Sequence, residues 1–153
     1  YDNNYYFASD LWKNRDVIEP KMKLFSEMYM SLKATKKHTK HFIQSKMYLF
    51  TGLDKANNYD ESFWLQDLEI LFKRIEICLT YGFSPYVMRF ETVDKSKFRK
   101  IYQNICQWTN HPSMIIGKAT FREFLEDGTF STKETKSFFD KQKHLWKYLD
   151  LKL

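Results

Sequence analysis

The sequence predicts an α/β fold in which short buried strands alternate with longer helices. Apolar, aromatic-rich runs at residues 5–10, 47–51 and 86–90 have the length and composition of strands. Between them, apolar residues recur at three- and four-residue spacing, which is typical of amphipathic helices. Because strands joined through helices pair in parallel, this order predicts a parallel sheet with right-handed crossovers.

The first predicted strand, YYFASD at 5–10, ends in polar residues and is followed by a helix. Asp16 is expected to cap that helix, and Pro20 suits its first turn. The helix is predicted to bury one apolar face, formed by Ile18, Met22, Phe25, Met28, Tyr29 and Leu32.

The second predicted strand, MYLFT at 47–51, stops at Gly52. After a polar loop, Asp60 stands where a helix cap is expected, and Glu61 lies in the first turn, where the helix dipole favours an acid. Gly82 marks the end of this helix. Its apolar stripe is formed by Leu65, Leu68, Phe72, Ile75 and Leu79.

The third predicted strand covers 86–90, with Pro85 at its entry, where a missing N–H is tolerated. A helix is expected over 96–108. Capping-box patterns at Thr120–Glu123 and Ser131–Glu134 then predict a short helix and a final one. Three parallel strands alone would leave apolar surface and both sheet edges exposed, so the pattern favours part of a larger barrel or open sheet.

Composition restricts the classes of function. The net charge of +6 and the 18 % aromatic content are compatible with an anionic partner such as nucleic acid. Cys78 and Cys106 have neither zinc nor disulfide spacing, and we expect buried thiols in a reducing cytoplasm. No apolar run reaches the ~18 residues of a membrane span, so no membrane partner is predicted. The chain does not begin with Met, so we expect that further residues precede Tyr1.

Three stretches carry a resemblance to a known family. They are MYLFTGLD at 47–54 with the helix at 67–75, GFSPYVMRFE at 82–91, and the segment at 98–125 that contains QWTNHP and TFREFL. They are similar to the fifth strand, the sixth strand and the following helix of radical S-adenosylmethionine (radical SAM) proteins of bacterial and phage type. The sequence departs from that pattern at Thr109 and His111, where the family often has Cys and Gln.

The resemblance implies the C-terminal half of a partial (βα) TIM-type barrel at 1–126 and a C-terminal helical extension at 127–153. In the family, the first half of the barrel carries a Cys-x3-Cys-x2-Cys motif that binds a [4Fe-4S] cluster. The cluster binds S-adenosylmethionine and cleaves it to a 5′-deoxyadenosyl radical. That motif is absent from this sequence. We therefore expect a wall of the cofactor and substrate cavity that holds no cofactor and has no catalytic activity without its N-terminal half.

Sites in such barrels lie at the carboxyl ends of the strands. This rule selects Ser9 and Asp10 after the first strand, and the resemblance implies that they contact the amino-acid or ribose part of S-adenosylmethionine. The resemblance also implies that Thr51 and Gly52 approach the adenine through their backbone. No residue is predicted to be catalytic, and no metal site is predicted in this chain.

The third strand supplies the remaining candidates. Val87 and Met88 are implied to press on the adenine and to bond it through the main chain. Arg89 and Glu91 alternate with Met88 along the strand. One of them is expected to face the lumen and touch substrate, and the other to form an exterior salt bridge.

Two alternatives remain open from the sequence. A basic, aromatic-rich module could bind nucleic acid through clustered lysines and ring stacking. The densest basic run is formed by Lys36, Lys37, Lys40 and Lys46. Clustering of Lys33, Lys36, Lys37 and Lys40 with exposed aromatic rings would support this alternative. A structural subunit could instead pair through an exposed sheet edge with another chain or a second copy.

Overall fold

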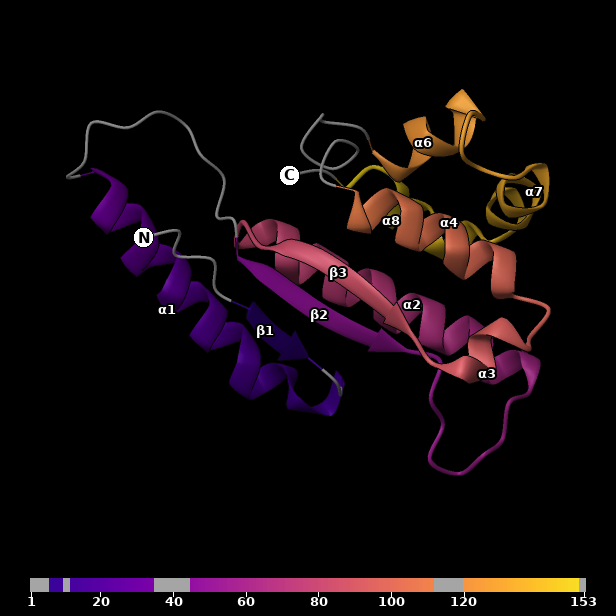
Figure 1. Cartoon of the computed structure of the whole chain (residues 1–153), viewed down its shortest axis with the longest axis horizontal. Helices are drawn as coiled ribbons and strands as arrows, with labels where there is room; N and C mark the ends of the chain where they lie inside the picture. The colour runs from indigo at the N-terminus through magenta and orange to yellow at the C-terminus, as the bar shows by residue number, and fades with distance from the viewer. Residues whose placement is uncertain (1–5, 10–11, 35–44, 112–119, 152–153) are drawn as a thin grey trace.

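The computed structural model describes residues 6–9, 12–34, 45–111 and 120–151, and it confirms an α/β fold. Its strands pair in parallel in the order β1-β2-β3, as predicted (Figure 1). The strands are β1 (Tyr6–Ser9), β2 (Lys46–Thr51) and β3 (Ser84–Arg89).

Helices join the strands and lie on one face of the sheet. The 3-10 turn η1 (Trp12–Asn14) and α1 (Arg15–Ala34) connect β1 to β2, and α2 (Glu61–Thr80) connects β2 to β3. After β3 come α3 (Glu91–Asp94) and α4 (Arg99–Asn110). In Figure 1, β2 and β3 lie in front of α2, with no described element drawn across them.

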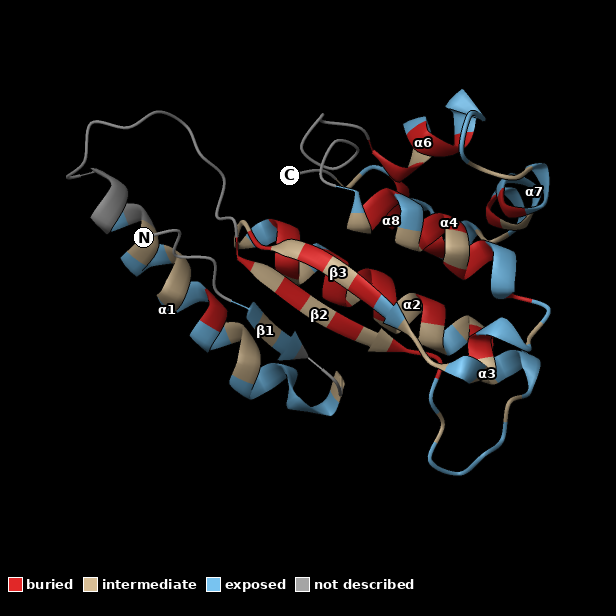
Figure 2. Ribbon diagram, in the orientation of Figure 1, coloured by how far each residue is buried: buried red, intermediate tan, exposed pale blue. Residues whose placement is uncertain are grey.

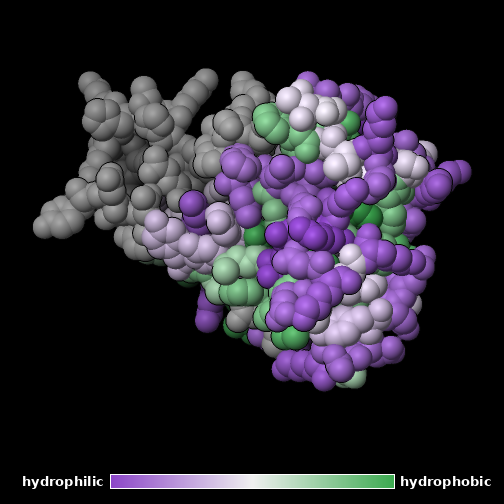
Figure 3. Space-filling model, turned by 45° about the vertical axis from the view of Figure 1, so that its right-hand side comes forward, coloured by the Kyte–Doolittle hydropathy of each residue, from purple (hydrophilic) through white to green (hydrophobic). Residues whose placement is uncertain are grey.

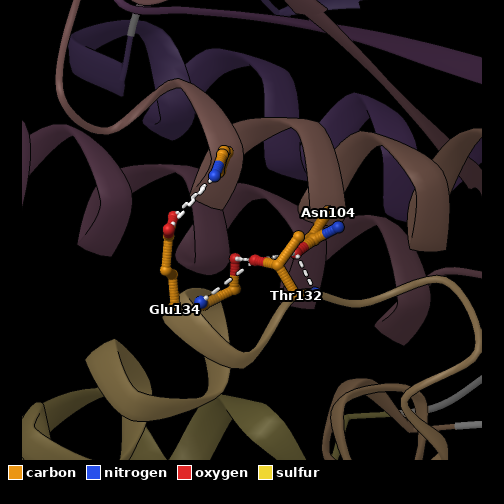
Figure 4. A network of polar contacts seen from close by, with 5 residues as sticks. Asn104, Thr132 and Glu134 are labelled. Carbon is orange, nitrogen blue, oxygen red and sulfur yellow. Dashed lines mark hydrogen bonds and ion pairs between the residues drawn. The ribbon is translucent and has the colours of Figure 1, made fainter.

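The chain ends in short helices that pack on α2 and α4 rather than on the sheet. They are α6 (Phe121–Asp127), α7 (Lys133–Lys141), the 3-10 turn η2 (Lys143–Leu145) and α8 (Trp146–Leu149). Buried Asn104 joins α4 to the start of α7. Its Oδ1 accepts a hydrogen bond of 3.1 Å from the backbone N–H of Thr132, the residue that caps α7 (Figure 4). Lys100 and Glu134 form an exposed ion pair beside it (3.0 Å; Figure 4).

The core lies between the sheet and the helices and continues into the C-terminal helices. Phe121 of α6 is fully buried and has ring contacts with Phe72 of α2, Trp108 of α4 and Phe139 of α7. This aromatic cluster joins α2, α4, α6 and α7 into one body.

Side chains alternate along β2 between the two faces of the sheet. Met47, Leu49 and Thr51 are buried against the helices. Lys46, Tyr48 and Phe50 point to the opposite face and are half-buried. One face of the sheet is therefore covered, and the other is open in the part of the chain that the structure describes.

Three helix ends lie where the sequence predicts them. Asp60 caps α2 through its side chain, and Thr120 forms a capping box with Glu123 at α6. Gly82 follows α2 with a φ of 77°. Its left-handed conformation is the usual reason for glycine at a helix end.

Several boundaries in the first half of the chain differ from the prediction. Asp16 lies inside the first turn of α1 instead of capping it, and Pro20 lies in the second turn. Met28 is 57 % exposed and does not belong to the buried face of α1. Pro85 lies inside β3 rather than at its entry. It is tolerated because β3 is the last strand of the described sheet, where no partner needs its missing N–H.

The C-terminal half also departs from the prediction. The predicted helix at 96–108 is observed at Arg99–Asn110, after the unpredicted short helix α3. The final helix is divided into α7, η2 and α8. Thr132, not Ser131, caps α7, because its hydroxyl accepts from the N–H of Thr135. None of the helices in the described ranges combines the length and apolar character needed to cross a bilayer.

Candidate functional site

A cavity of about 700 Å³ lies at the carboxyl end of β2, beside the start of α1 and the first turns of α2. Cavities of 300–1,000 Å³ are the usual size for small-molecule sites. Aromatic rings, acids and bases all contribute to its wall. The lining includes Trp12, Phe50, Gly52, Asp67, Arg74 and Phe90.

Asp67 of α2 organises the wall of this cavity through its carboxylate. Oδ2 accepts from the hydroxyl of Thr51 at 2.5 Å and from the hydroxyl of Tyr102 at 2.6 Å. Oδ1 accepts from the backbone N–H of Gly52 at 3.3 Å. A single carboxylate thus ties the end of β2 to α2 and α4.

Tyr102 is fully buried where it meets Asp67. Burial, and then the neighbouring Asp67 carboxylate, raise the pKa of Tyr102 well above its usual value. Tyr102 therefore stays protonated across the neutral range and keeps donating its hydrogen bond to Asp67.

Gly52 makes the turn that follows β2, and its φ is 84°. A Cβ at this position would lie 2.0 Å from Cγ2 of Val93. The carbonyl of Gly52 also accepts a hydrogen bond from the hydroxyl of Thr92. The turn requires glycine for its conformation and for the close approach of α3.

On β3, the side chains of Val87 and Met88 point to opposite faces. Val87 is buried against the helices, whereas Met88 is 38 % exposed on the open face. Asn110 of α4 accepts from the N–H of Val87 at 2.8 Å and donates to its C=O at 2.9 Å. The main-chain groups of Val87 are engaged by this amide, and neither Val87 nor Met88 lines the cavity.

Arg89 and Glu91 do not share a strand, because β3 ends at Arg89 and Glu91 begins α3. Arg89 forms a half-buried ion pair with Asp94 at 3.5 Å. Glu91 is exposed and pairs with Lys95 within α3. The Lys95 ammonium lowers the pKa of the Glu91 carboxyl.

Other predicted residues are placed only in part. Ser9 is the last residue of β1 and is the partner of Leu49 in the sheet. Asp10, Lys36, Lys37 and Lys40 lie outside the described residues, and the side chain of Lys33 is likewise not described. The structure brings Thr51 and Gly52 together with Asp67 at the cavity.

The open face of the sheet carries a row of aromatic rings. Tyr6, Tyr48 and Tyr86 come from three adjacent strands, with centroid distances of 6.1 Å and 5.4 Å between neighbours. Near the carboxyl end, Phe50 and Phe90 lie 5.8 Å apart and both line the cavity. The Lys46 ammonium lies 5.3 Å from the centre of the Tyr86 ring.

The two thiols are protonated and separate. Burial raises the pKa of Cys78 to about 12 and that of Cys106 to about 11. Among the described residues, no group of three or more His, Cys, Asp or Glu side chains has the arrangement of a metal site. The described residues therefore do not fit an iron–sulfur cluster, which takes thiolate ligands.

Comparisons with protein-family models, with curated proteins and with solved structures found no match to this chain.

Sequence reasoning missed the residues that organise the site. Asp67 lies three residues after buried Trp64 and directly before buried Leu68. A lone acid beside the apolar stripe of a helix is the signal that could have identified it. Asn110 lies just beyond the helix predicted over 96–108, and nothing in the sequence indicates its bond to β3.

Proposed function

We propose that this chain forms the C-terminal half of a partial βα barrel of the radical SAM type, and that its open sheet face is a wall of the barrel lumen. The observation that carries the proposal is the arrangement of the sheet. Strand order follows chain order, and α1 and α2 pack on one face. A barrel wall has this arrangement, whereas doubly wound sheets reverse strand order and carry helices on both faces.

The open face supports a lumen role. The aromatic rings of Tyr48 and Tyr86, and the side chain of Met88, would face the centre of a closed barrel. The cavity beside Gly52 lies at the carboxyl ends of the strands, where barrel enzymes bind their ligands. Phe50 and Phe90 offer apolar rings for a planar group such as adenine.

In this proposal each candidate residue has a defined task. Thr51 and Asp67 hold the turn at Gly52, which forms part of the cavity wall. Met88 contacts the ligand from the open face of β3. Arg89 lies on the other face of β3, beside Gln103 and Cys106 of α4, and its ion pair with Asp94 is structural. The iron–sulfur cluster and its cysteine ligands would belong to the N-terminal half, and this chain would supply binding surface.

The test begins with the coding sequence before Tyr1. We expect a Cys-x3-Cys-x2-Cys motif about one half-barrel upstream, in the same reading frame or in a neighbouring gene. The protein that includes it should purify with a [4Fe-4S] cluster and cleave S-adenosylmethionine after reduction. Met88→Glu should weaken binding of S-adenosylmethionine, measured by calorimetry. Phe130→Glu, an exposed substitution far from the cavity, is the matched control.

The 153-residue chain should bind no iron and cleave no S-adenosylmethionine. Stoichiometric iron on the purified 153-residue chain would contradict the proposal. The absence of the cysteine motif from both the upstream coding sequence and the neighbouring genes would also contradict it.

A further inference from the structure

The outer face of α1 exposes apolar side chains that neither the core nor the cavity uses. Val17, Leu24 and Met28 are 59 %, 57 % and 57 % exposed. They are separated by seven and four residues, which places them in one stripe along the helix. We call these three side chains the α1 stripe.

The α1 stripe is distinct from the face that α1 buries. Ile18, Met22 and Phe25 pack inward, with the Phe25 ring 5.2 Å from Phe7 and 5.6 Å from Phe83. Figure 2 shows that α1 and β1 are mostly exposed or half-buried, in contrast to the buried centre of the sheet. The helix therefore has apolar residues on two faces, only one of which is covered.

The edge of β1 is also free. In the described ranges, β1 pairs with β2 and with no strand on its other side. Tyr6 is 58 % exposed at this edge. Unpaired strand edges present N–H and C=O groups that another strand can satisfy. The free edge and the α1 stripe belong to the same strand–helix unit.

Other parts of the surface differ. Figure 3 brings the right-hand side of Figure 1 forward, and hydrophilic side chains cover most of that face, with hydrophobic ones in small separate groups. Single exposed apolar residues are ordinary on a soluble protein, but a stripe beside a free strand edge is typical of an interface.

We propose that β1 and α1 bind a preceding βα unit: its strand pairs in parallel with the free edge of β1, and its helix packs on the α1 stripe. This inference rests on the proposed barrel and names the surface through which its N-terminal half attaches. The molecule already uses this geometry, since β1 pairs with β2 while α1 and α2 meet around Met22 and Cys78.

A second copy of the chain is a poorer occupant. Two β1 edges related by a two-fold axis would pair antiparallel and continue the sheet, leaving the face of Tyr48 and Tyr86 open. A preceding βα unit covers the β1 edge and the α1 stripe together, and the further strands of a closed barrel would enclose the aromatic face.

The experiment uses the polypeptide encoded directly before Tyr1, on the order of 120 residues for half of a barrel. It is co-expressed with the 153-residue chain, and association is measured by sedimentation and calorimetry. Leu24→Glu together with Met28→Lys should weaken association by roughly tenfold or more, since charges would enter an apolar interface. Phe130→Glu, at a residue that is 51 % exposed between α6 and α7, away from α1 in Figure 1, should leave association unchanged.

The variants must act on the interface and not on folding. In the 153-residue chain alone, the Leu24→Glu and Met28→Lys pair should leave the melting temperature unchanged. Hydrogen exchange at the amides of β1 should slow when the upstream polypeptide binds.

Each outcome separates the two proposals. Association that depends on the α1 stripe, with an upstream segment that holds no cluster, supports the interface and contradicts the radical SAM function. If the upstream segment holds a cluster but binds the Leu24→Glu and Met28→Lys variant as tightly as the original chain, the proposed interface is overturned and the radical SAM function is not. A stable dimer of the 153-residue chain that the double variant dissociates, or the absence of an encoded strand–helix segment upstream, also overturns the interface.

Discussion

The two edges of the sheet are built differently. At the β3 edge, Asn110 occupies both main-chain groups of Val87, and Pro85 has no N–H to offer. At the β1 edge, the described structure places no such side chain, and the neighbouring helix carries the α1 stripe. The β3 edge is therefore closed to further strand pairing, whereas the β1 edge is open in the described residues. This difference is expected if β3 is the last strand and β1 an inner strand of a larger sheet.

The packing of the two sides differs in the same way. The β3 side is backed by α4, α6 and α7 around the fully buried ring of Phe121. The β1 side is backed by α1, in which Met22 is buried while Phe25 is only half-buried. We therefore expect most of the stability of the chain to reside on the β3 side.

The largest expected effect is the loss of the Phe121 ring. Phe121→Ala should destabilise the chain by about 3–5 kcal/mol, the usual cost of deleting a buried aromatic ring. Phe25→Ala is the matched variant on the β1 side and should cost about half as much, because its ring is only partly buried. Urea denaturation followed by circular dichroism measures both. Equal losses would show that the two sides contribute alike.

The next effect concerns the turn at Gly52. Gly52→Ala should cost about 3 kcal/mol, since the added Cβ meets Val93 and the backbone is left-handed. Gly128→Ala is the matched control, because Gly128 is also left-handed with a φ of 68°, but an added Cβ would meet only the Glu126 carbonyl oxygen, at an ordinary contact distance of 3.9 Å. It should cost about 1 kcal/mol from conformation alone. Thermal melts of both variants test this difference, and equal shifts would contradict a close approach of α3.

The smallest of these effects concerns the closed edge. Asn110→Ala removes both bonds to Val87 and should cost about 1–2 kcal/mol. Asn110→Asp keeps an acceptor for the N–H of Val87 but loses the donor to its C=O, so it tests the two bonds separately. Hydrogen exchange at the Val87 amide should accelerate in the Ala variant. An unchanged exchange rate would mean that other groups close this edge.

Much of the fold could be predicted from local patterns. Strand length, helical spacing and the caps at Asp60 and Thr120 depend on neighbours in the chain, and the structure confirms them. The parallel pairing followed from the length of the connections. The predicted parallel sheet needed no knowledge of distant contacts.

The organisation of the site could not be predicted in this way. Asp67 meets Tyr102 across 35 residues, and Asn110 reaches Val87 across 23. Such bonds depend on how α4 lies against β3, which no local pattern specifies. The prediction for Met28 was wrong for a local reason: helical spacing places Met28 with the exposed Val17 and Leu24, and not with the buried Met22.

The amide of Asn110 also limits how copies of this chain can assemble. Joining the β3 edge of one copy to the β1 edge of the next would repeat without end and produce a filament. Because Asn110 already occupies the main chain of Val87, β1 is the edge left for sheet extension in the described residues. A single side chain on α4 thus opposes end-to-end stacking of copies through the β3 edge.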